Sequence, residues 1–425
     1  MITSPAFRGK RYALLGLARS GLATLRALVA SGADIVAWDS REEARALASD
    51  GVRLADPLSI DLAGFDGVIV SPGVPINRHP IAEHAHRAHV PLIGDIELFA
   101  LARSSLPAHK VVGITGTNGK STTTALIHHL LASAGREATL GGNIGLPILG
   151  QEPLGAGGVY MLELSSYQID LTYSLDCDIA VLTNITPDHL DRYDGFADYA
   201  AAKERLFTLQ HADKLAVIAT EDDCCRMIAS RINHRLTRVS SRDIKDQSGW
   251  PSLQGPHNAQ NVACAIAVVR ALGLDDEEIE AGLASYPGLP HRMERVRELK
   301  GVLYVNDSKA TNPTSTAPAL AAFPSVHWIL GGMAKTDELD VCAPHFGRVR
   351  GAYAIGEAGP FFVQLLSPHM PVADYGTLDA AVRAAAAVAK AGDTVLLSPA
   401  CASFDQFRDF EARGDAFRAC VEGLA

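Results

Sequence analysis

A short glycine-containing segment at residues 114–122, ITGTNGKST, carries the groups that a phosphate-binding site needs. Gly116 and Gly119 allow backbone N–H groups to close on an anion, and Lys120 adds a mobile positive charge. Ser121 can hold Mg²⁺. A standard P-loop has a further glycine five residues before Gly119, where this chain has isoleucine, so the turn is of a shorter kind. The pattern predicts an ATP site, with a purely structural glycine turn as the alternative.

Carboxylate and imidazole groups follow two other apolar runs. Glu163 ends the run VYMLE, and Asp188 and His189 follow the run IAVLTNIT. An ionised carboxylate in a buried strand is costly unless it meets a cation. Glu163 therefore predicts a metal ligand, with a structural ion pair as the alternative. His189 is explained equally well as a structural histidine or as a member of the same site.

Three more polar residues lie in segments with helical patterns. Lys203, in AAAKERLF, has the surroundings of an ordinary solvated lysine on a helix surface. Asn258 and Asn261, in PHNAQN, are three residues apart and share a helix face, where their amide groups can bind the edge of adenine. N-capping by Asn258 is the alternative.

A second set of turns, near the start of the chain, suits a nucleotide diphosphate. The turn GLARSG at 16–21 follows an apolar run and enters a helical pattern, so its N–H groups can bind phosphate. Asp39 and Ser40 follow the next run, where an acidic residue meets ribose or base in Rossmann-type domains; a helix cap explains Asp39 equally well. Gly73 lies in a turn after the third run. GxGxxG is absent, which counts against a dehydrogenase.

The last third of the chain repeats this arrangement. Polar loops follow three further apolar runs: NDSKATN at 306–312, GGMAK at 331–335 and SPACAS at 398–403. Parallel α/β sheets bind ligands at the carboxyl ends of their strands. His291 and Arg292 precede these loops, so we expect cations of this region to close on phosphate.

These loops need parallel sheets to position them, and short apolar runs do alternate with helical patterns along the chain. A polar segment at 103–109 and the sequence YPGLP at 286–290 indicate boundaries. The predicted class is α/β with three domains. They are an N-terminal Rossmann-like domain at 1–94, a central P-loop ATPase-type mononucleotide-binding domain at 95–288 and a C-terminal Rossmann-like domain at 289–425.

Composition excludes several classes of protein. The 425 residues carry a net charge of −10, so the chain lacks the basic face of nucleic-acid and membrane-surface binders. Seven cysteines without CxxC or CxxH spacing fit neither a disulfide framework nor a zinc site. The sequence contains no export signal and no apolar run of membrane-spanning length. We expect a cytoplasmic protein with no nucleic-acid partner and no membrane insertion.

The ordered motifs ITGTNGKST, GGNIGLP, LELSSYQ, NITPDHLDRY, GPHNAQN, LPHR, NDSKATN and LSPACASFDQF resemble those of the Mur ligases, ATP-dependent enzymes of peptidoglycan synthesis. The resemblance covers nearly the whole chain and is closest to members that add D-glutamate to UDP-N-acetylmuramoyl-L-alanine. It implies an acyl phosphate made from ATP, a tetrahedral intermediate formed with glutamate, and release of ADP and phosphate. ATP and two Mg²⁺ ions are the implied cofactors, and a monomer is expected.

The resemblance also implies a role for each matching residue. ATP is expected at Gly116, Thr117, Asn118, Gly119, Lys120, Ser121, Thr122, Asn261, Arg292 and Asp307. The UDP-sugar is expected at Leu17, Ser20, Asp39, Ser40, Gly73, Asn143, Gln168 and His189. The amino acid is expected at Thr311, Lys335, Ser403 and Phe410. Mg²⁺ is expected at Ser121, Glu163, His189 and Lys203, the last as a carbamate, which replaces the interpretation of Lys203 as a solvated lysine. The expected catalytic residues are Lys120, His189, Lys203 and Lys309, and the third domain is expected to close on ATP.

Two alternatives and one departure stay open at this point. A related ligase that adds another amino acid or L-glutamate would share most motifs, although the Asp-Asn-Pro-Arg motif of the diaminopimelate-adding members is absent. A nucleotide switch would hydrolyse ATP without any amino acid. The family's Gly-Gly-Asp-Gly-Lys loop contains Met333 and Ala334 here, so the resemblance does not define the shape of the loop that carries Lys335.

Overall fold

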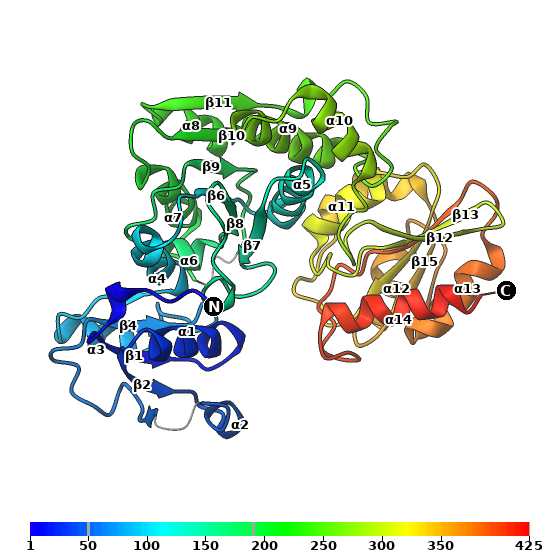
Figure 1. Ribbon diagram of the computed structural model, residues 1–425. Helices are drawn as coiled ribbons and strands as arrows, with labels where there is room; N and C mark the ends of the chain where they lie inside the picture. Colours follow the sequence, from blue (N-terminus) through cyan, green and yellow to red (C-terminus); the bar gives the residue numbers. More distant parts are fainter. Residues whose placement is uncertain (49–51, 189–191, 425) are drawn as a thin grey trace. The chain divides into compact units, whose positions relative to one another are not determined.

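The computed structural model describes residues 1–48, 52–188 and 192–424. Three β-sheets, each packed against helices, confirm the predicted α/β class (Figure 1). The chain forms two compact units, one of Met1–Ile244 with Gln260–Leu283 and the other of Lys245–Ala259 with Ala284–Ala425. The first two sheets lie in the first unit and the third sheet in the second unit. The domain boundaries at 94/95 and 288/289 stay predictions.

The first sheet is parallel, with the strand order β3-β2-β1-β4-β5. Its strands are β1 (Arg11–Leu15), β2 (Asp34–Trp38), β3 (Arg53–Leu54), β4 (Gly67–Val70) and β5 (Leu92–Ile93), and its helices are α1 (Arg19–Ala30), α2 (Glu42–Arg45), α3 (Ile81–Arg87) and α4 (Asp95–Ala102). Because side chains alternate along a strand, Leu14 packs in the core with α1 and α4, while Leu15 packs in the core with α3. The strand order reverses between β1 and β4. The loops after these two strands therefore frame the crevice in which such sheets bind ligands.

The central sheet is also parallel, with the order β11-β10-β9-β6-β8-β7. Its strands are β6 (Lys110–Thr115), β7 (Ala138–Gly142), β8 (Val159–Glu163), β9 (Ile179–Leu182), β10 (Leu215–Ala219) and β11 (Arg235–Val239). The helices along this part of the chain are α5 (Lys120–Ser133), α6 (Ser166–Asp170), α7 (Phe196–Thr208), α8 (Asp223–Arg231), α9 (Pro256–Ala271) and α10 (Asp276–Ser285). Strands β8, β9 and β10 are buried along their whole length, as parallel strands covered on both faces are. Strand β6 lies between β8 and β9, so the loop that follows β6 is flanked by the ends of both.

The third sheet has the order β12-β13-β17-β14-β15-β16, in which only the pair β12 and β13 is antiparallel. Its strands are β12 (Glu294–Leu299), β13 (Val302–Asn306), β14 (Val326–Gly331), β15 (Val349–Ile355), β16 (Val372–Gly376) and β17 (Thr394–Leu397). Helices α11 (Pro313–Ala321) and α12 (Gly359–Leu366) pack in the core of one face, and α13 (Leu378–Val388) and α14 (Phe410–Glu422) in that of the other. Strand β17 lies between β13 and β14. The loops after these three strands are therefore neighbours at one edge of the sheet.

Short 3-10 helices complete the fold. They are Pro5–Phe7, Arg103–Ser105, Ile148–Gly150, Ser241–Asp243 and Asp340–Arg348. Among the helices that the structure describes, none combines the length and the apolar character that a membrane span needs.

Candidate active site

The predicted phosphate loop joins β6 to α5 in a conformation that needs both of its glycines. Gly116 has φ 147° and Gly119 has φ 83°, and Gly119 is the residue before the first turn of α5. A Cβ atom on Gly116 would lie 2.0 Å from Thr183 Oγ1, and one on Gly119 would lie 2.3 Å from Asn261 Oδ1. Any other residue at these two positions would be strained and would clash. The loop thereby leads directly into the N-terminus of α5, the end of a helix that favours anions.

Neighbouring segments hold this loop in place. The Nζ atom of Lys120 donates hydrogen bonds to the carbonyl oxygens of Gly116 at 2.9 Å and Thr117 at 2.8 Å. The backbone N–H of Asn118 donates to Asn184 Oδ1 at 2.9 Å. The segment after β9 therefore fixes the loop before any ligand is present. Ser121 is buried and Thr122 is half-buried at the start of α5.

Glu163 ends β8 directly beside the phosphate loop. It is 2% exposed and pairs in register with Ile114 of β6. Its Oε1 accepts a hydrogen bond from Asn143 Nδ2 at 3.2 Å, whereas Oε2 is buried and has no hydrogen-bond partner among the described residues. A buried carboxylate oxygen of this kind is costly unless a cation meets it.

Lys203 is buried, which contradicts its interpretation as a solvated helix lysine. It lies on α7 with 2% of its surface exposed, because its helix face packs against the phosphate loop rather than facing water. Its Nζ atom donates to the carbonyl oxygen of Gly116 at 2.8 Å and lies 4.5 Å from the centre of the Tyr199 ring. Burial and the nearby charge of Lys120 lower the pKa of Lys203 well below its usual value, while Asp188 and Asp170 oppose this shift. The sequence pattern could not show this burial.

The two asparagines considered for the adenine edge both lie on α9. Asn261 is buried on α9, and its Oδ1 atom accepts a hydrogen bond from Thr123 Oγ1 at 3.3 Å. Asn258 lies inside the same helix rather than before it, and its Nδ2 atom donates to the carbonyl oxygen of Gln254 at 3.1 Å. It is therefore not the N-cap of α9. His189 lies outside the described residues.

Five of the residues expected to hold the UDP-sugar line one cavity of about 360 Å³ in the first unit. They are Ser20, Asp39, Gly73, Asn143 and Gln168. Ser20 lies at the start of α1, Asp39 follows β2, Gly73 follows β4, Asn143 follows β7 and Gln168 lies on α6. The fold brings these segments together at the reversal of strand order in the first sheet. Leu17 is buried, and Ser40 is exposed; neither lines this cavity.

Asp39 is fixed at the wall of this cavity. Its Oδ2 accepts from the backbone N–H of Leu17 at 2.8 Å, and its Oδ1 accepts from Arg41 Nε at 3.2 Å. Although burial acts to raise it, these hydrogen bonds hold the pKa of Asp39 below its usual range. The residue before α2 is Arg41, so Asp39 is not the helix cap considered from the sequence.

Sequence reasoning missed two cations of the same cavity. Arg19 and Arg41 line it together with the predicted residues. Arg19 Nη2 donates to the carbonyl oxygen of Gly145 at 2.8 Å, which joins the start of α1 to the central sheet's glycine loop. Both arginines could have been predicted from the sequence, because a diphosphate needs cations and each arginine is next to a residue expected to bind the UDP-sugar.

The residues expected to hold the amino acid gather at the carboxyl edge of the third sheet. Lys335, after β14, is exposed, and its Nζ atom donates to Thr311 Oγ1 at 3.3 Å. Met333 and Ala402 exchange backbone hydrogen bonds of 3.0 Å in both directions, which brings the lysine loop beside Ser403. Although Met333 and Ala334 depart from the family's loop sequence, the backbone of the lysine loop is therefore paired with the loop after β17.

Lys309 and Phe410 meet at the same edge. The Nζ atom of Lys309 lies 3.7 Å from the centre of the Phe410 ring. Asp307, directly after β13, accepts from Ser398 Oγ at 2.8 Å, and its burial raises its pKa to about 7. Arg292 is half-buried in the segment before β12.

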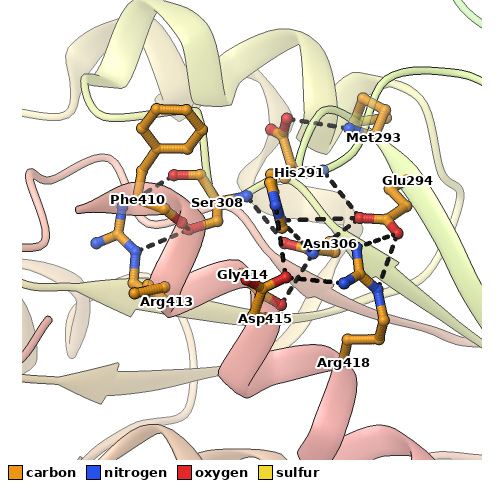
Figure 2. Close-up of polar contacts among 12 residues, drawn as sticks. His291, Met293, Glu294, Asn306, Ser308, Phe410, Arg413, Gly414, Asp415 and Arg418 are labelled. Atoms are coloured by element: carbon orange, nitrogen blue, oxygen red, sulfur yellow. Dashed lines mark hydrogen bonds and ion pairs between the residues drawn. The ribbon is translucent and has the colours of Figure 1, made fainter. Parts of the chain in front are cut away.

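His291 is held inside the second unit. It is 7% exposed, and its Nδ1 atom lies 3.0 Å from Asn306 Nδ2 (Figure 2). Its ring packs edge-on against Phe410 with 6.1 Å between ring centres. A Cβ atom on Gly414 would lie 2.1 Å from His291 Nδ1, so a glycine at this position of α14 leaves room for the ring.

Two family models match the chain. The model described as the Mur ligase middle domain matches residues 114–252, and the model described as the Mur ligase, glutamate ligase domain, matches residues 291–401. Together they cover more than half of the 425 residues. They contain the phosphate loop, Glu163 and Lys203 in one case, and Asp307, Lys309 and Lys335 in the other.

Relatives match over the full length. The chain is 66% identical to the UDP-N-acetylmuramoylalanine--D-glutamate ligase of Sphingopyxis alaskensis, over 100% of both chains. It is 63% identical to the protein of the same name from Novosphingobium aromaticivorans, over 100% of this chain and 97% of that one.

Solved structures share the fold at low sequence identity. UDP-N-acetylmuramate-alanine ligase MurC of Thermotoga maritima has a TM-score of 0.59 and 18% identity, over 97% of this chain and 99% of that chain. MurF ligase of Thermotoga maritima, in complex with ADP, has a TM-score of 0.63 and 19% identity, over 98% of this chain and 96% of that chain. Since both the site motifs and the full-length relatives agree with this fold, the chain belongs to the Mur ligases, the family of enzymes that form amide bonds with the use of ATP.

Proposed function

We propose that this enzyme joins D-glutamate to UDP-N-acetylmuramoyl-L-alanine in peptidoglycan precursor synthesis, with conversion of ATP to ADP and phosphate. The observation that carries the proposal is the 66% identity, over the full length of both chains, to a ligase named for that substrate and that amino acid. The geometry of the three groups of site residues is compatible with it. These relationships favour the ligase over the nucleotide switch and the dehydrogenase.

The chemistry requires activation of a carboxylate. The alanine carboxylate oxygen attacks the γ-phosphorus of ATP, and ADP leaves. The glutamate amine then attacks the acyl carbon to give a tetrahedral intermediate, which loses phosphate to form the amide. A carboxylate is a poor electrophile, and phosphorylation turns one of its oxygens into a leaving group. The protein must therefore stabilise charge on the transferring phosphoryl group.

The phosphate loop is suited to the ATP phosphates in this scheme. Gly116, Thr117, Asn118 and Gly119 present backbone groups, and Lys120 supplies a cation at the start of α5. Ser121, Thr122 and Asn261 are proposed to complete the ATP site in the first unit, where Asn261 is buried beside Gly119. Arg292, Asp307 and Lys309 are proposed to act on ATP from the second unit.

The groups at the end of β8 fit Mg²⁺. Glu163 offers a buried anionic oxygen without a hydrogen-bond partner among the described residues, and hard cations prefer such oxygens. Ser121, Glu163 and Lys203 are proposed as ligands, and His189 joins them by resemblance alone. When bound, Mg²⁺ offsets negative charge on the phosphoryl group that is transferred.

Lys203 is proposed to carry a carbamate. Its lowered pKa favours the neutral amine, which is the form that adds to CO₂. The amine nitrogen bonds to the CO₂ carbon and loses a proton, so that a neutral buried amine becomes an anionic carbamate. The positive charge of Lys120, which disfavours protonation of the amine, attracts this anion, and the carbamate adds an oxygen ligand beside Gly116.

The cavity between the first two sheets is proposed to hold the UDP-sugar. Its size suits a nucleotide-sized ligand, and Arg19 and Arg41 supply charge for the diphosphate. Leu17, Ser20, Asp39, Ser40 and Gly73 are proposed around the uridine diphosphate. Asn143 and Gln168 are proposed around the muramoyl arm, together with His189.

The carboxyl edge of the third sheet is proposed to hold glutamate. Lys335 and Thr311 are hydrogen-bonded to one another, and Ser403 lies in the neighbouring loop. A dicarboxylate needs paired donors for each carboxylate once water is excluded. Phe410 is proposed to form the wall of this pocket below Lys309.

A phosphate-release assay tests the proposal. The enzyme is incubated with ATP, Mg²⁺, UDP-N-acetylmuramoyl-L-alanine and D-glutamate, and each substrate is omitted in turn. Release that needs all of them supports the ligase. Release without any amino acid would support the switch, and no release in the complete mixture would refute the proposal.

A competition assay tests which enantiomer of glutamate the enzyme uses. D-glutamate and L-glutamate compete at equal concentration, and the product is hydrolysed and analysed by chiral chromatography. The proposal predicts D-glutamate in the product. An L-glutamate product would instead support a related ligase. A cytoplasmic, monomeric enzyme is proposed, and its mass in solution is measurable by light scattering.

A further inference from the structure

A single buried arginine connects the loops that carry the proposed amino-acid site. Arg413, on α14, is 1% exposed and donates hydrogen bonds from all three of its guanidinium nitrogens. Figure 2 shows its two contacts with Ser308. Nε donates to Ser308 Oγ at 3.0 Å, and Nη2 donates to the carbonyl oxygens of Ser308 at 2.9 Å and Cys401 at 3.0 Å. Nη1 donates to the carbonyl oxygens of Gly331 and Ala402, both at 3.3 Å.

These acceptors come from three different strand ends. Ser308 follows β13, Gly331 ends β14, and Cys401 and Ala402 follow β17. The same three segments carry Lys309, Lys335 and Ser403. Because the guanidinium is a rigid planar fork, it sets the three loops at fixed distances from one another.

Among the described residues, the hydrogen-bond acceptors of the buried Arg413 guanidinium are neutral oxygens. Its acceptors are four carbonyl oxygens and one hydroxyl oxygen. Burial lowers the pKa of Arg413 to about 10, so the side chain stays protonated at neutral pH. A buried cation without a carboxylate in contact is costly for stability. Asp405 offsets part of this charge from a distance, and the Cys401 thiol feels the charges of Arg413, Asp405 and Lys335.

The same helix turn also orients Lys309. Ser308 Oγ accepts from Arg413 and donates to the carbonyl oxygen of Phe410 at 2.8 Å. The Phe410 ring in turn lies under the Nζ atom of Lys309 at 3.7 Å. The loop after β13 is thereby attached to the first turn of α14 at two points.

We propose that Arg413 is the positioning residue of the amino-acid site. It holds the loops that carry Lys309, Lys335 and Ser403 in fixed positions relative to one another. It also places a buried positive charge behind the pocket that takes a dicarboxylate. The inference rests on the proposed function. It predicts that a change of Arg413 alters the KM for the amino acid more than the KM for ATP.

The test compares Arg413→Met, Arg413→Lys and Ser308→Ala with the full-length enzyme. Arg418→Met is the matched control, because Arg418 lies on the same helix and pairs with Glu294 and Asp415 rather than with the three loops. For each variant the KM for D-glutamate, the KM for ATP, kcat and the melting temperature are measured.

Arg413→Met is expected to raise the KM for D-glutamate about 10- to 100-fold, with a change of less than about 3-fold in the KM for ATP. Arg413→Lys keeps the charge but cannot reach three loops, so its KM for D-glutamate is expected between the wild-type and Arg413→Met values. Ser308→Ala releases one loop and is expected to give a smaller rise. Arg418→Met is expected to match the wild type in both KM values.

Three results would overturn the inference. They are a wild-type KM for D-glutamate in Arg413→Met, equal rises in both KM values, or wild-type behaviour of Arg413→Lys. If Arg413→Met does not fold, Arg413→Lys and Ser308→Ala decide the question by the same criteria. A wild-type enzyme that releases no phosphate with D-glutamate refutes the proposed function itself, and this inference with it. An active wild type with an unchanged Arg413→Met refutes only the positioning role.

Discussion

The Nζ atom of Lys203 donates a hydrogen bond of 2.8 Å to the carbonyl oxygen of Gly116, the first glycine of the phosphate loop. A helix lysine and a loop glycine, 87 positions apart in the chain, thus meet in a buried site. The amine is next to Lys120, which further disfavours its protonation. This relationship motivates the first prediction.

Lys203→Ala is expected to lower kcat by about 100-fold or more, the scale expected when a metal-site group is lost. A short-chain carboxylic acid added to the assay should restore part of the activity, because it can supply the missing anionic oxygens. Phosphate release measures both effects. Lys203→Arg serves as the control, since it fills the space and so leaves no room for the added acid. Full activity of Lys203→Ala would contradict the carbamate.

Gly119→Ala is expected to raise the KM for ATP about 10-fold or more, because its Cβ would lie 2.3 Å from Asn261 Oδ1 and distort the phosphate loop. Gly135→Ala is the matched control: Gly135 has φ 69°, similar to φ 83° at Gly119, but a Cβ there meets no atom within 4 Å. Both variants carry the backbone strain of about 1–2 kcal/mol. An equal rise of the KM for ATP in both variants would show that strain, rather than the clash, is responsible.

Arg19→Met is expected to raise the KM for the UDP-sugar about 10-fold, because it removes a cation from the cavity wall. The KM for D-glutamate should stay within about 2-fold of the wild-type value. Arg26→Met, at an exposed position of the same helix, is the control. Unchanged binding of the UDP-sugar by Arg19→Met would argue that the cavity holds another part of the substrate.

Asp95→Asn is expected to stabilise the protein at neutral pH. Complete burial raises the pKa of Asp95 from 3.8 to about 6, and its Oδ1 has no hydrogen-bond partner among the described residues. The folded state therefore binds the proton more tightly than the unfolded state, and the free energy of unfolding falls as the pH rises from about 4 to about 6. Above that window the buried charge costs up to about 3 kcal/mol.

Thermal unfolding at pH 4 and pH 7 checks this prediction. The gain of Asp95→Asn over the wild type should be larger at pH 7 than at pH 4. Asp198→Asn, at an exposed position at the start of α7, should show no such difference. An equal gain at both pH values would assign the effect to packing rather than to the charge.

Much of the fold follows from local sequence patterns. The interior strands β1, β4, β9, β14 and β17 coincide with apolar runs, because both faces of these strands are buried. The edge strands β11, β12 and β16 do not coincide with apolar runs. Nearly all positions of these three strands are exposed or half-exposed, so polar residues interrupt their sequences.

Some features of the candidate site also follow from local sequence, whereas others depend on tertiary contacts. The sequence alone determined the α/β class and the shortened phosphate loop, because hydrophobic spacing and glycine turns are local properties. It also determined the resemblance to the Mur ligases, which rests on the order of the motifs. These features need no knowledge of which segments meet.

Only the tertiary structure decided the environment of each side chain. Contacts between distant segments bury Lys203, bring Arg19 to the same cavity as Asp39 and join three loops to Arg413. They also bury a Glu163 oxygen that has no hydrogen-bond partner in the part of the chain that the structure describes. The type of a charged residue does not show whether it lies in water or in a core, and the free energy of its charge differs between these two environments by several kcal/mol. The sequence therefore names the chemical groups, and the packing around them sets their charge and position.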